Sequence, residues 1–459
     1  MSALRFQKEL KSLAAALCLI AAAVPCSTVH AQGYIGDARR IALGGVGGSD
    51  NVASEMVQNQ RPYRSLTIPL GIFQIFGDLD VFNPDSDGFD PVLASEYAAN
   101  PIHFAFGRKH ASGFNRFVND IVNARVSLDL NAYRRFTLEP RLLAEGLGNP
   151  SWGKTFPVAK SGDVSHAIYV GAGPYLAFRT NAQVDPRLVQ LFGAAANTYF
   201  RNTTLTIADT TTDQFALAVT GGYRGRFPLP DGRGGGSSAN GTYVAANYHY
   251  LHGFHFDTFA MTTRFDTDAA GLLTFRPNTV PIAIERRQSS TGRGFALDGG
   301  VAFVVDKWNF GAGLSGIANR ITWKKLERDQ YTLQNLLSGG DFVHVTLPPP
   351  AGVERLTLPV VFSADVGYTT GMWGAMAEYA HGFQGHNIHG GFEYRTGAVE
   401  WRGGGRLSRS RWYPSGGVGF TVTPRFAVDV ALFQVNTYIE RRNQAALAIS
   451  LRFSQQPKP

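Results

Sequence analysis

Near its C-terminus the chain alternates apolar and polar side chains with few breaks. From residue 443 to residue 453, Leu447, Ile449 and Leu451 occupy alternate positions, with small, polar or charged residues between them. Successive side chains of a β-strand point to opposite faces, so this segment predicts a strand with one apolar face. The same alternation recurs at 388–395, 399–406 and 426–432. Repeated strands joined by short turns predict an all-β antiparallel fold and are typical of a transmembrane β-barrel.

Two architectures share this strand pattern. In a soluble β-sandwich the apolar face of each strand packs into a core and the polar face meets water. In a membrane barrel the apolar face meets lipid and the polar face lines the lumen. The alternation leaves both open, so the direction of the faces has to be decided by other features.

The N-terminal segment favours export. Residues 1–31 contain three basic residues, then an apolar run over 13–24, and end in small residues at Ala31, which predicts a cleaved secretory signal peptide. The apolar run is too short to cross a bilayer as a helix. Cys18 and Cys26 both lie within the predicted signal peptide, so no disulfide framework is expected in the mature chain.

Composition narrows the class further. After the predicted signal no run of eighteen apolar residues occurs, which excludes membrane-spanning helices. The net charge of +8 is spread along the chain without a basic tract, so no nucleic-acid partner is expected. A closed barrel satisfies every strand edge within a bilayer. We therefore expect a barrel in the outer membrane of a Gram-negative-type bacterium, inserted by the barrel insertion machinery.

The expected organisation has three parts: a signal peptide at 1–31, an N-terminal plug at 32–100, and a barrel at 101–459. Residues 32–100 alternate poorly, which favours a plug inside the lumen, with a disordered leader as the alternative. From residue 102 onward the strand signals predict about 14 strands, with 12 to 16 allowed. Long connections are expected at 180–212, 227–241, 266–293 and 319–355, the first with a short helix near 186–194.

The two ends of the chain resemble a known family. The opening resembles that of the FadL-like outer-membrane proteins, which include long-chain fatty-acid and hydrocarbon transporters and the related PorV-type proteins. It is carried by Gly36, Asp37, Ala38, Arg39, Leu43, Gly44 and Gly45. Segments within 390–420 also resemble the closing hairpins of that family. The resemblance implies a 14-stranded barrel with an N-terminal plug that passes hydrophobic molecules.

Charged residues on the polar faces of the C-terminal strands are the candidate functional residues. They are Glu378, Glu393, Arg395, Glu400, Arg402, Arg406, Asp429 and Arg452. Such side chains can pair across strands and hold a lumen rigid. They can equally bind the carboxylate of a ligand through an arginine fork.

Metal and catalytic sites are weakly indicated. An acidic segment places oxygen ligands at alternate positions, as the first half of a calcium loop does: Asn83, Asp85, Asp87 and Asp90. Ala94 stands where a bidentate Glu is required, so a solvated acidic loop is favoured. The histidines at 249, 252 and 255, and at 381, 386 and 389, are interpreted as membrane-interface residues. No catalytic spacing stands out, and neither an enzyme nor a cofactor is predicted.

The function predicted from the sequence is passive uptake of hydrophobic or amphipathic small molecules across the outer membrane. The expected partners are outer-membrane lipid and a hydrophobic small-molecule ligand. Two alternatives stay open: a PorV-like role in holding an exported protein partner at the membrane, and a general porin.

Overall fold

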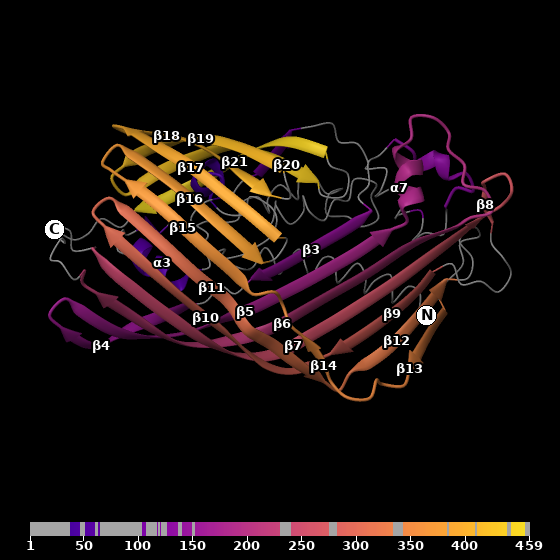
Figure 1. Cartoon of the computed structure of the whole chain (residues 1–459), viewed down its shortest axis with the longest axis horizontal. Coiled ribbons are helices and arrows are strands. Elements are labelled where there is room, and N and C mark those ends of the chain that lie inside the picture. The colour runs from indigo at the N-terminus through magenta and orange to yellow at the C-terminus, as the bar shows by residue number, and fades with distance from the viewer. Residues whose placement is uncertain are drawn as a thin grey trace.

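The fold is one antiparallel sheet. A computed structural model describes residues 37–45, 51–59, 63–64, 103–106, 117, 120, 126–135, 140–148, 152–229, 240–274, 282–333, 343–382, 385–408, 411–437 and 442–454. Within them, 21 strands form a single curved sheet (Figure 1). The predicted all-β antiparallel fold is confirmed. No described helix has the length and apolar character needed to cross a membrane.

Among the described residues, the helical elements are few and short. They are α2 (Ala38–Ala42), α3 (Val52–Asn59), η2 (Leu130–Tyr133) and α7 (Pro186–Gly193). The strands up to the first long hairpins are β1 (Tyr63–Arg64), β2 (His103–Phe106), β3 (Arg141–Gly148), β4 (Trp152–Ser161), β5 (Val164–Val184), β6 (Thr204–Phe227) and β7 (Gly241–Thr267). Next come β8 (Leu273–Thr274), β9 (Ile282–Ser289), β10 (Thr291–Val305), β11 (Trp308–Lys324), β12 (Glu327–Leu333), β13 (Val343–Leu347) and β14 (Glu354–Leu356). The C-terminal strands are β15 (Val361–Thr369), β16 (Trp373–Gly382), β17 (Gly385–Thr396), β18 (Val399–Ser408), β19 (Arg411–Thr423), β20 (Phe426–Thr437) and β21 (Arg442–Ser454).

Several short strands share one position in the sheet, end to end. Both β3 and β4 pair with β5, and both β9 and β10 pair with β7. Across the described residues the order is β3/β4, β5, β6, β7, β8/β9/β10, β11/β12, β13/β14/β15, β16, β17, β18, β19, β20, β21 and β1/β2, which is fourteen positions. Within the described part of the chain, no pairing joins β1 or β2 to β3 or β4, so the sheet is not closed there.

Burial along β6 shows which face of the sheet is inward. Ala216, Ala218 and Thr220 are almost fully buried, whereas Leu217 and Val219 between them are 40% and 47% exposed. The exposed face is therefore the apolar one, and the buried face is small and polar. A soluble sandwich has the opposite distribution. This inversion answers the question that alternation alone leaves open, and it favours a sheet whose outer face meets lipid.

Exposed apolar side chains cover the outer face as a belt with aromatic residues at both edges. On β19, Trp412 and Phe420 mark the two edges and are separated by about 26 Å of strand at 3.3 Å per residue. With the strands tilted by about 40°, that length covers about 20 Å along the bilayer normal, most of the apolar band of about 25 Å in outer-membrane barrels. Among the described residues of β15–β21, no Asp, Glu, Lys or Arg occupies an outward position.

The two ends of the sheet differ in their connections. At one end, brief turns at 162–163, 306–307, 370–372, 397–398 and 424–425 join successive strands, and β21 finishes there with Phe453 opposite Phe426. The longer connection 228–240, between β6 and β7, also lies at this end. At the other end the chain makes longer excursions, including 185–203 and 268–281. We call these the short-turn end and the long-loop end.

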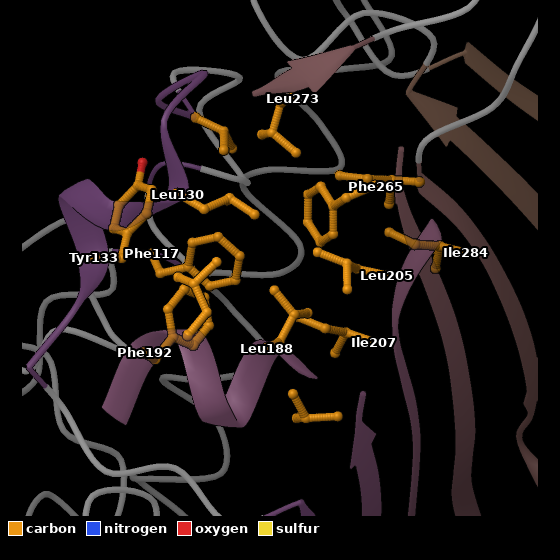
Figure 2. Packing of buried hydrophobic residues seen from close by; sticks show 14 of the residues in the cluster. Phe117, Leu130, Tyr133, Leu188, Phe192, Leu205, Ile207, Phe265, Leu273 and Ile284 are labelled. Carbon is orange, nitrogen blue, oxygen red and sulfur yellow. The ribbon is translucent and has the colours of Figure 1, made fainter. Parts of the chain in front are cut away.

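At the long-loop end, β5–β7 and β9 extend beyond the belt and carry a hydrophobic cluster (Figure 2). Phe192 and Leu188 of α7 pack there with Leu205 and Ile207 of β6 and Phe265 of β7. The odd positions of β6 face outward throughout, because its pairing with β5 is regular. The helix therefore covers the outer face of the sheet where that face leaves the belt, and keeps its apolar residues from water.

The structure tests several sequence expectations about elements. The short helix predicted near 186–194 is confirmed as α7, which begins after the N-cap Asp185 with Pro186 in its first turn. A bend at 128–129 leads into η2, within the region where strand signals were expected from residue 102 onward. The connections expected at 266–293 and 319–355 contain strands β8, β9 and β12–β14, because hairpins continue the sheet beyond the belt. The predicted signal peptide lies outside the described residues.

Candidate functional site

The predicted plug motif forms α2 against the inner face of the C-terminal strands. Asp37 caps the helix, because its Oδ1 accepts a hydrogen bond of 2.8 Å from the amide of Arg40. Ala38, Ile41 and Ala42 are buried and pack with Tyr413, Ala431, Phe433, Ala446 and Ala448 of β19–β21. Gly44 and Gly45 follow in the left-handed conformation and end the helix. Gly36 lies outside the described residues.

Glycines in the wall make room for this helix. A Cβ added at Gly391 would stand 2.5 Å from the carbonyl oxygen of Leu43, and one at Gly404 would stand 2.5 Å from the carbonyl carbon of Leu43. A Cβ at Gly417 would lie 2.7 Å from the Cβ of Ala42. Side chains at these positions would displace α2. The glycines of β17–β19 therefore leave the space in which the plug motif packs, and we call such a space a glycine seat.

Three hydrogen bonds tie the backbone of α2 to the wall. The hydroxyl of Ser450 accepts from the amide of Ala38 at 3.1 Å, and the hydroxyl of Ser415 donates to the carbonyl of Ala42 at 3.2 Å. Nδ1 of His389 lies 2.8 Å from the carbonyl oxygen of Gly44. Both ends of the helix are thus satisfied by the sheet, which fixes its position.

Six of the eight predicted inward charges meet in one network beside α2. Arg402, whose side chain has no exposed surface, donates to Glu393 at 2.6 Å, to Asp429 at 2.7 Å and to Glu400. Arg452 contacts Glu400 at 2.5 Å and Asp429 at 3.0 Å. These side chains come from β17, β18, β20 and β21, so the network joins four strand positions.

The plug motif enters this network through Arg39. Its Nε lies 2.9 Å and its Nη2 3.2 Å from the two carboxylate oxygens of Glu393, which also accepts from Arg395 at 2.7 Å. Removing one partner from a buried charge cluster leaves the others uncompensated, which costs about 3–5 kcal/mol. The network therefore fixes the register of the C-terminal strands and anchors α2 to them.

The other two predicted charges, Glu378 and Arg406, have different described neighbours. Glu378 is buried on β16, between Asp365 and His389 on the neighbouring strands. Arg406 is buried on β18 with its guanidinium 5.1 Å from the ring centre of Tyr413. A ligand-binding role for these eight residues stays a prediction. The candidate calcium loop of Asn83, Asp85, Asp87 and Asp90 lies outside the described residues.

The second helix, α3, packs on a different part of the inner wall (Figure 1). Ser54 donates to Oδ1 of Asp365 on β15 at 2.9 Å, and the Asn51 amide donates to the carbonyl of Val301 at 3.1 Å. A Cβ at Gly313 would lie 2.8 Å from the backbone of Asn51, and Gly300 and Gly311 also leave space for this segment. The N-terminal segment is therefore seated at two places in the interior, β17–β21 and β7–β15.

A buried polar cluster lies on the inner face between β6 and β11. His249 Nδ1 lies 2.8 Å from the hydroxyl of Thr220, and its Nε2 lies 2.6 Å from Asp298. Asp298 also accepts from the hydroxyl of Ser315 at 3.0 Å and from the amide of Gly316 at 2.8 Å. Sequence reasoning missed this cluster, and its interpretation of His249 as an interface residue is wrong, because that side chain is buried and inward. No local pattern joins residues so distant in sequence.

Towards the long-loop end the inner face becomes apolar and aromatic. Trp323 is fully buried there and stacks on Phe256, with ring centres 5.4 Å apart. Its indole N–H donates to Gln214 at 3.2 Å. Tyr175 and Leu251 belong to the same inward cluster. Sequence reasoning missed Trp323 because it lies in a segment expected to be a loop.

The remaining histidines are divided between the faces. His252 is exposed on the outer face, and His381 lies directly opposite His386 with ring centres 4.4 Å apart. His389 points inward to α2 and does not join that pair. Within the described residues, no three His, Cys, Asp or Glu side chains are placed to hold a metal ion.

The comparisons with known proteins give structural neighbours only. No family model matches the chain, and no curated protein matches its sequence. The toluene transporter TbuX of Ralstonia pickettii is similar over 74% of this chain and 98% of its own, at 11% identity and a TM-score of 0.31. A mutant of the monoaromatic hydrocarbon channel TodX covers 69% and 91%, at 10% identity and a TM-score of 0.32. A mutant Rh. blastica porin covers 68% and 100%, at 8% identity and a TM-score of 0.24.

Proposed function

We propose that the protein is an outer-membrane channel for passive uptake of hydrophobic or amphipathic small molecules. The observation that carries this proposal is the inverted sheet, apolar on its exposed face and small or charged on its buried face. A belt of that height with aromatic edges suits a bilayer. The short-turn end, where β21 finishes, is assigned to the periplasm, and the long-loop end to the cell exterior.

The two interior helices support a plugged channel. Helices α2 and α3 occupy glycine seats on the inner wall, and α2 is tied there by the ion pair between Arg39 and Glu393. A general porin needs an open aqueous lumen, and docked helices weigh against it. Passage of a substrate would then require one seat to be vacated.

The apolar inner wall supports the substrate class. Barrel interiors are ordinarily polar. Here Trp323, Phe256 and Leu251 face inward at the long-loop end, above the polar cluster around His249. A molecule that enters from outside would meet this apolar surface first. The identity of the substrate is left to experiment.

The test is an uptake assay in living cells. The full chain is expressed in a Gram-negative strain lacking its own transporters for hydrophobic compounds, with a long-chain fatty acid or an aromatic hydrocarbon as sole carbon source. We expect growth on at least one such compound, with no increase in permeability to small sugars. Trp323→Ala should slow uptake, whereas Trp412→Ala, a change of the same size on the outer face, should not.

Two outcomes would reject the proposal. Sugar permeability without growth on hydrophobic compounds would indicate a general porin. Failure of the chain to appear in the outer membrane fraction would reject the membrane assignment itself.

A further inference from the structure

Four basic side chains gather on the outer face of β10, β11 and β14. Arg293 lies directly opposite Thr322, which lies directly opposite Arg355 on the next strand. Arg320 and Lys324 flank Thr322 on β11, two positions away on each side and on the same face. Neighbouring strands are about 5 Å apart and alternate residues about 7 Å, so all four side chains surround Thr322. We call Arg293, Arg320, Lys324 and Arg355 the basic patch.

The basic patch begins where the apolar belt ends. Outward positions of β10 carry Val305, Phe303 and Val301 from the short-turn end upward, then Phe295, and then Arg293. The path from Val305 to Phe295 covers about 33 Å of strand, or about 25 Å along the normal of a bilayer when the strand is tilted by 40°. The first basic residue thus stands at the height of the lipid headgroups at the long-loop end.

The charge of the basic patch is uncompensated. All four side chains are exposed, and none forms an ion pair with any residue that the structure describes. The only described contact of the four with an aromatic ring is that of Arg320, whose guanidinium lies 5.0 Å from the ring centre of Phe295. By contrast, Arg286, which also faces outward, pairs with Asp257 at 2.5 Å. Positive charge without an ion-pair partner at the height of the lipid headgroups favours the binding of an anionic group.

We propose that the basic patch binds the phosphate groups of a phosphorylated glycolipid in the outer leaflet, with the acyl chains against the belt. The proposal rests on the proposed function, since that function sets the membrane height and the exposed side. Arginine forks suit phosphate oxygens, and three arginines around one hydroxyl offer several such contacts. The rings of Phe295 and Tyr250 lie immediately below, where the first methylenes of the acyl chains would lie.

The closing experiment measures lipid binding directly. The refolded full chain in neutral detergent is titrated with bisphosphorylated lipid A and, separately, with the same lipid after enzymatic removal of its phosphates, with binding followed by native mass spectrometry. The test variant carries Arg293→Gln, Arg320→Gln and Arg355→Gln together. We expect its affinity for the phosphorylated lipid to fall roughly 100-fold, at about a factor of five for each basic side chain. Affinity for the dephosphorylated lipid should be low and unchanged.

A matched control removes three charges at the opposite end of the sheet, with Lys160→Gln, Lys307→Gln and Arg425→Gln, all exposed near the short turns. Retained lipid binding in the control supports the basic patch. Equal losses in both triple variants, or equal binding of both lipids by the unaltered chain, would overturn the proposal. So would competition by inorganic phosphate alone at the same concentration, because that would indicate a site for the free anion.

A second measurement distinguishes failure of the proposed function from failure of lipid binding by the basic patch. Each protein is also reconstituted into phosphatidylcholine vesicles and tested for protection of the belt from protease. A chain that does not insert would reject the membrane assignment. A chain that inserts normally but has no preference for the phosphorylated lipid would reject only the basic patch.

Discussion

Changing Arg39 to Met should release the plug motif from the wall. Methionine keeps much of the length and apolar bulk of the arginine stem but removes both hydrogen bonds to Glu393, at 2.9 and 3.2 Å. Glu393 retains Arg395 and Arg402, so it is not left without a partner. The loss should therefore fall on the docking of α2 and leave the sheet intact.

The magnitude follows from these contacts. Hydrogen bonds between charged groups contribute about 1.5–3 kcal/mol, and the side chain of Arg39 is 23% exposed, which places the expected loss near 2 kcal/mol. At 1.4 kcal/mol for each tenfold change, the undocked population of α2 should rise roughly 30-fold.

Cysteine labelling can measure that population. Both native cysteines, Cys18 and Cys26, lie in the predicted signal peptide, so one engineered thiol reports alone. Leu43→Cys places it at a position that is 5% exposed when α2 is docked. A maleimide reagent then reacts only during undocking, and its rate reports the undocking equilibrium when redocking is fast.

Arg40 supplies the matched control. It neighbours Arg39 on the same helix, and its side chain has no ion pair with any described residue. Arg40→Met should leave the labelling rate of Leu43→Cys unchanged. In a Glu393→Gln background, Arg39→Met should add little. Two results would refute a role for the Arg39–Glu393 ion pair in docking α2. One is an equal labelling rate in both methionine variants; the other is an undiminished effect of Arg39→Met in the Glu393→Gln background.

Three further perturbations test other parts of the account. Gly391→Ala should weaken the docking of α2 by about 1–3 kcal/mol and so speed the labelling of Leu43→Cys. Gly416→Ala, where a Cβ has room, should leave the labelling rate unchanged. An unchanged rate in the Gly391 variant would argue against the glycine seat. Arg402→Met should lower the free energy of unfolding in vesicles by about 3–5 kcal/mol, measured by urea titration, and a neutral effect would contradict a structural role for the network. Ala377→Arg, in the middle of the outer belt, should cost about 2–4 kcal/mol in vesicles and Thr396→Arg, at its edge, about 0–1 kcal/mol; equal costs would remove the lipid-facing assignment.

The sequence was informative where structure depends on local pattern. Alternation at Leu447, Ile449 and Leu451 predicted strands, and burial now shows these residues on the face away from the interior. The short helix predicted near 186–194 forms as α7, and its cap Asp185 and Pro186 favour the first turn. The faces of β17, β18, β20 and β21 were assigned correctly, because the side chains of a strand have a period of two and one face is apolar.

Patterns of local sequence were uninformative where partners are distant. The pairing of His249 with Asp298 joins β7 to β10 through register, which no spacing in the sequence encodes. Trp323 lay in a segment expected to be a loop, because beyond the belt the strands no longer need an apolar outward face. Likewise, the contact of Arg39 with Glu393 spans the length of the chain. The family resemblance predicted a plug but not its anchor.

The central claim is that the N-terminal helices, docked on the inner face of a lipid-facing sheet, block the passage of ions through the channel. Single-channel conductance in planar bilayers tests it most directly, with the full mature chain compared with a variant lacking residues 32–60, which removes α2 and α3 but keeps β1 and β2. The account predicts a silent full-length protein and a steady conductance in the shortened one. A wide, steady pore from the full-length chain, or silence from both, would contradict it.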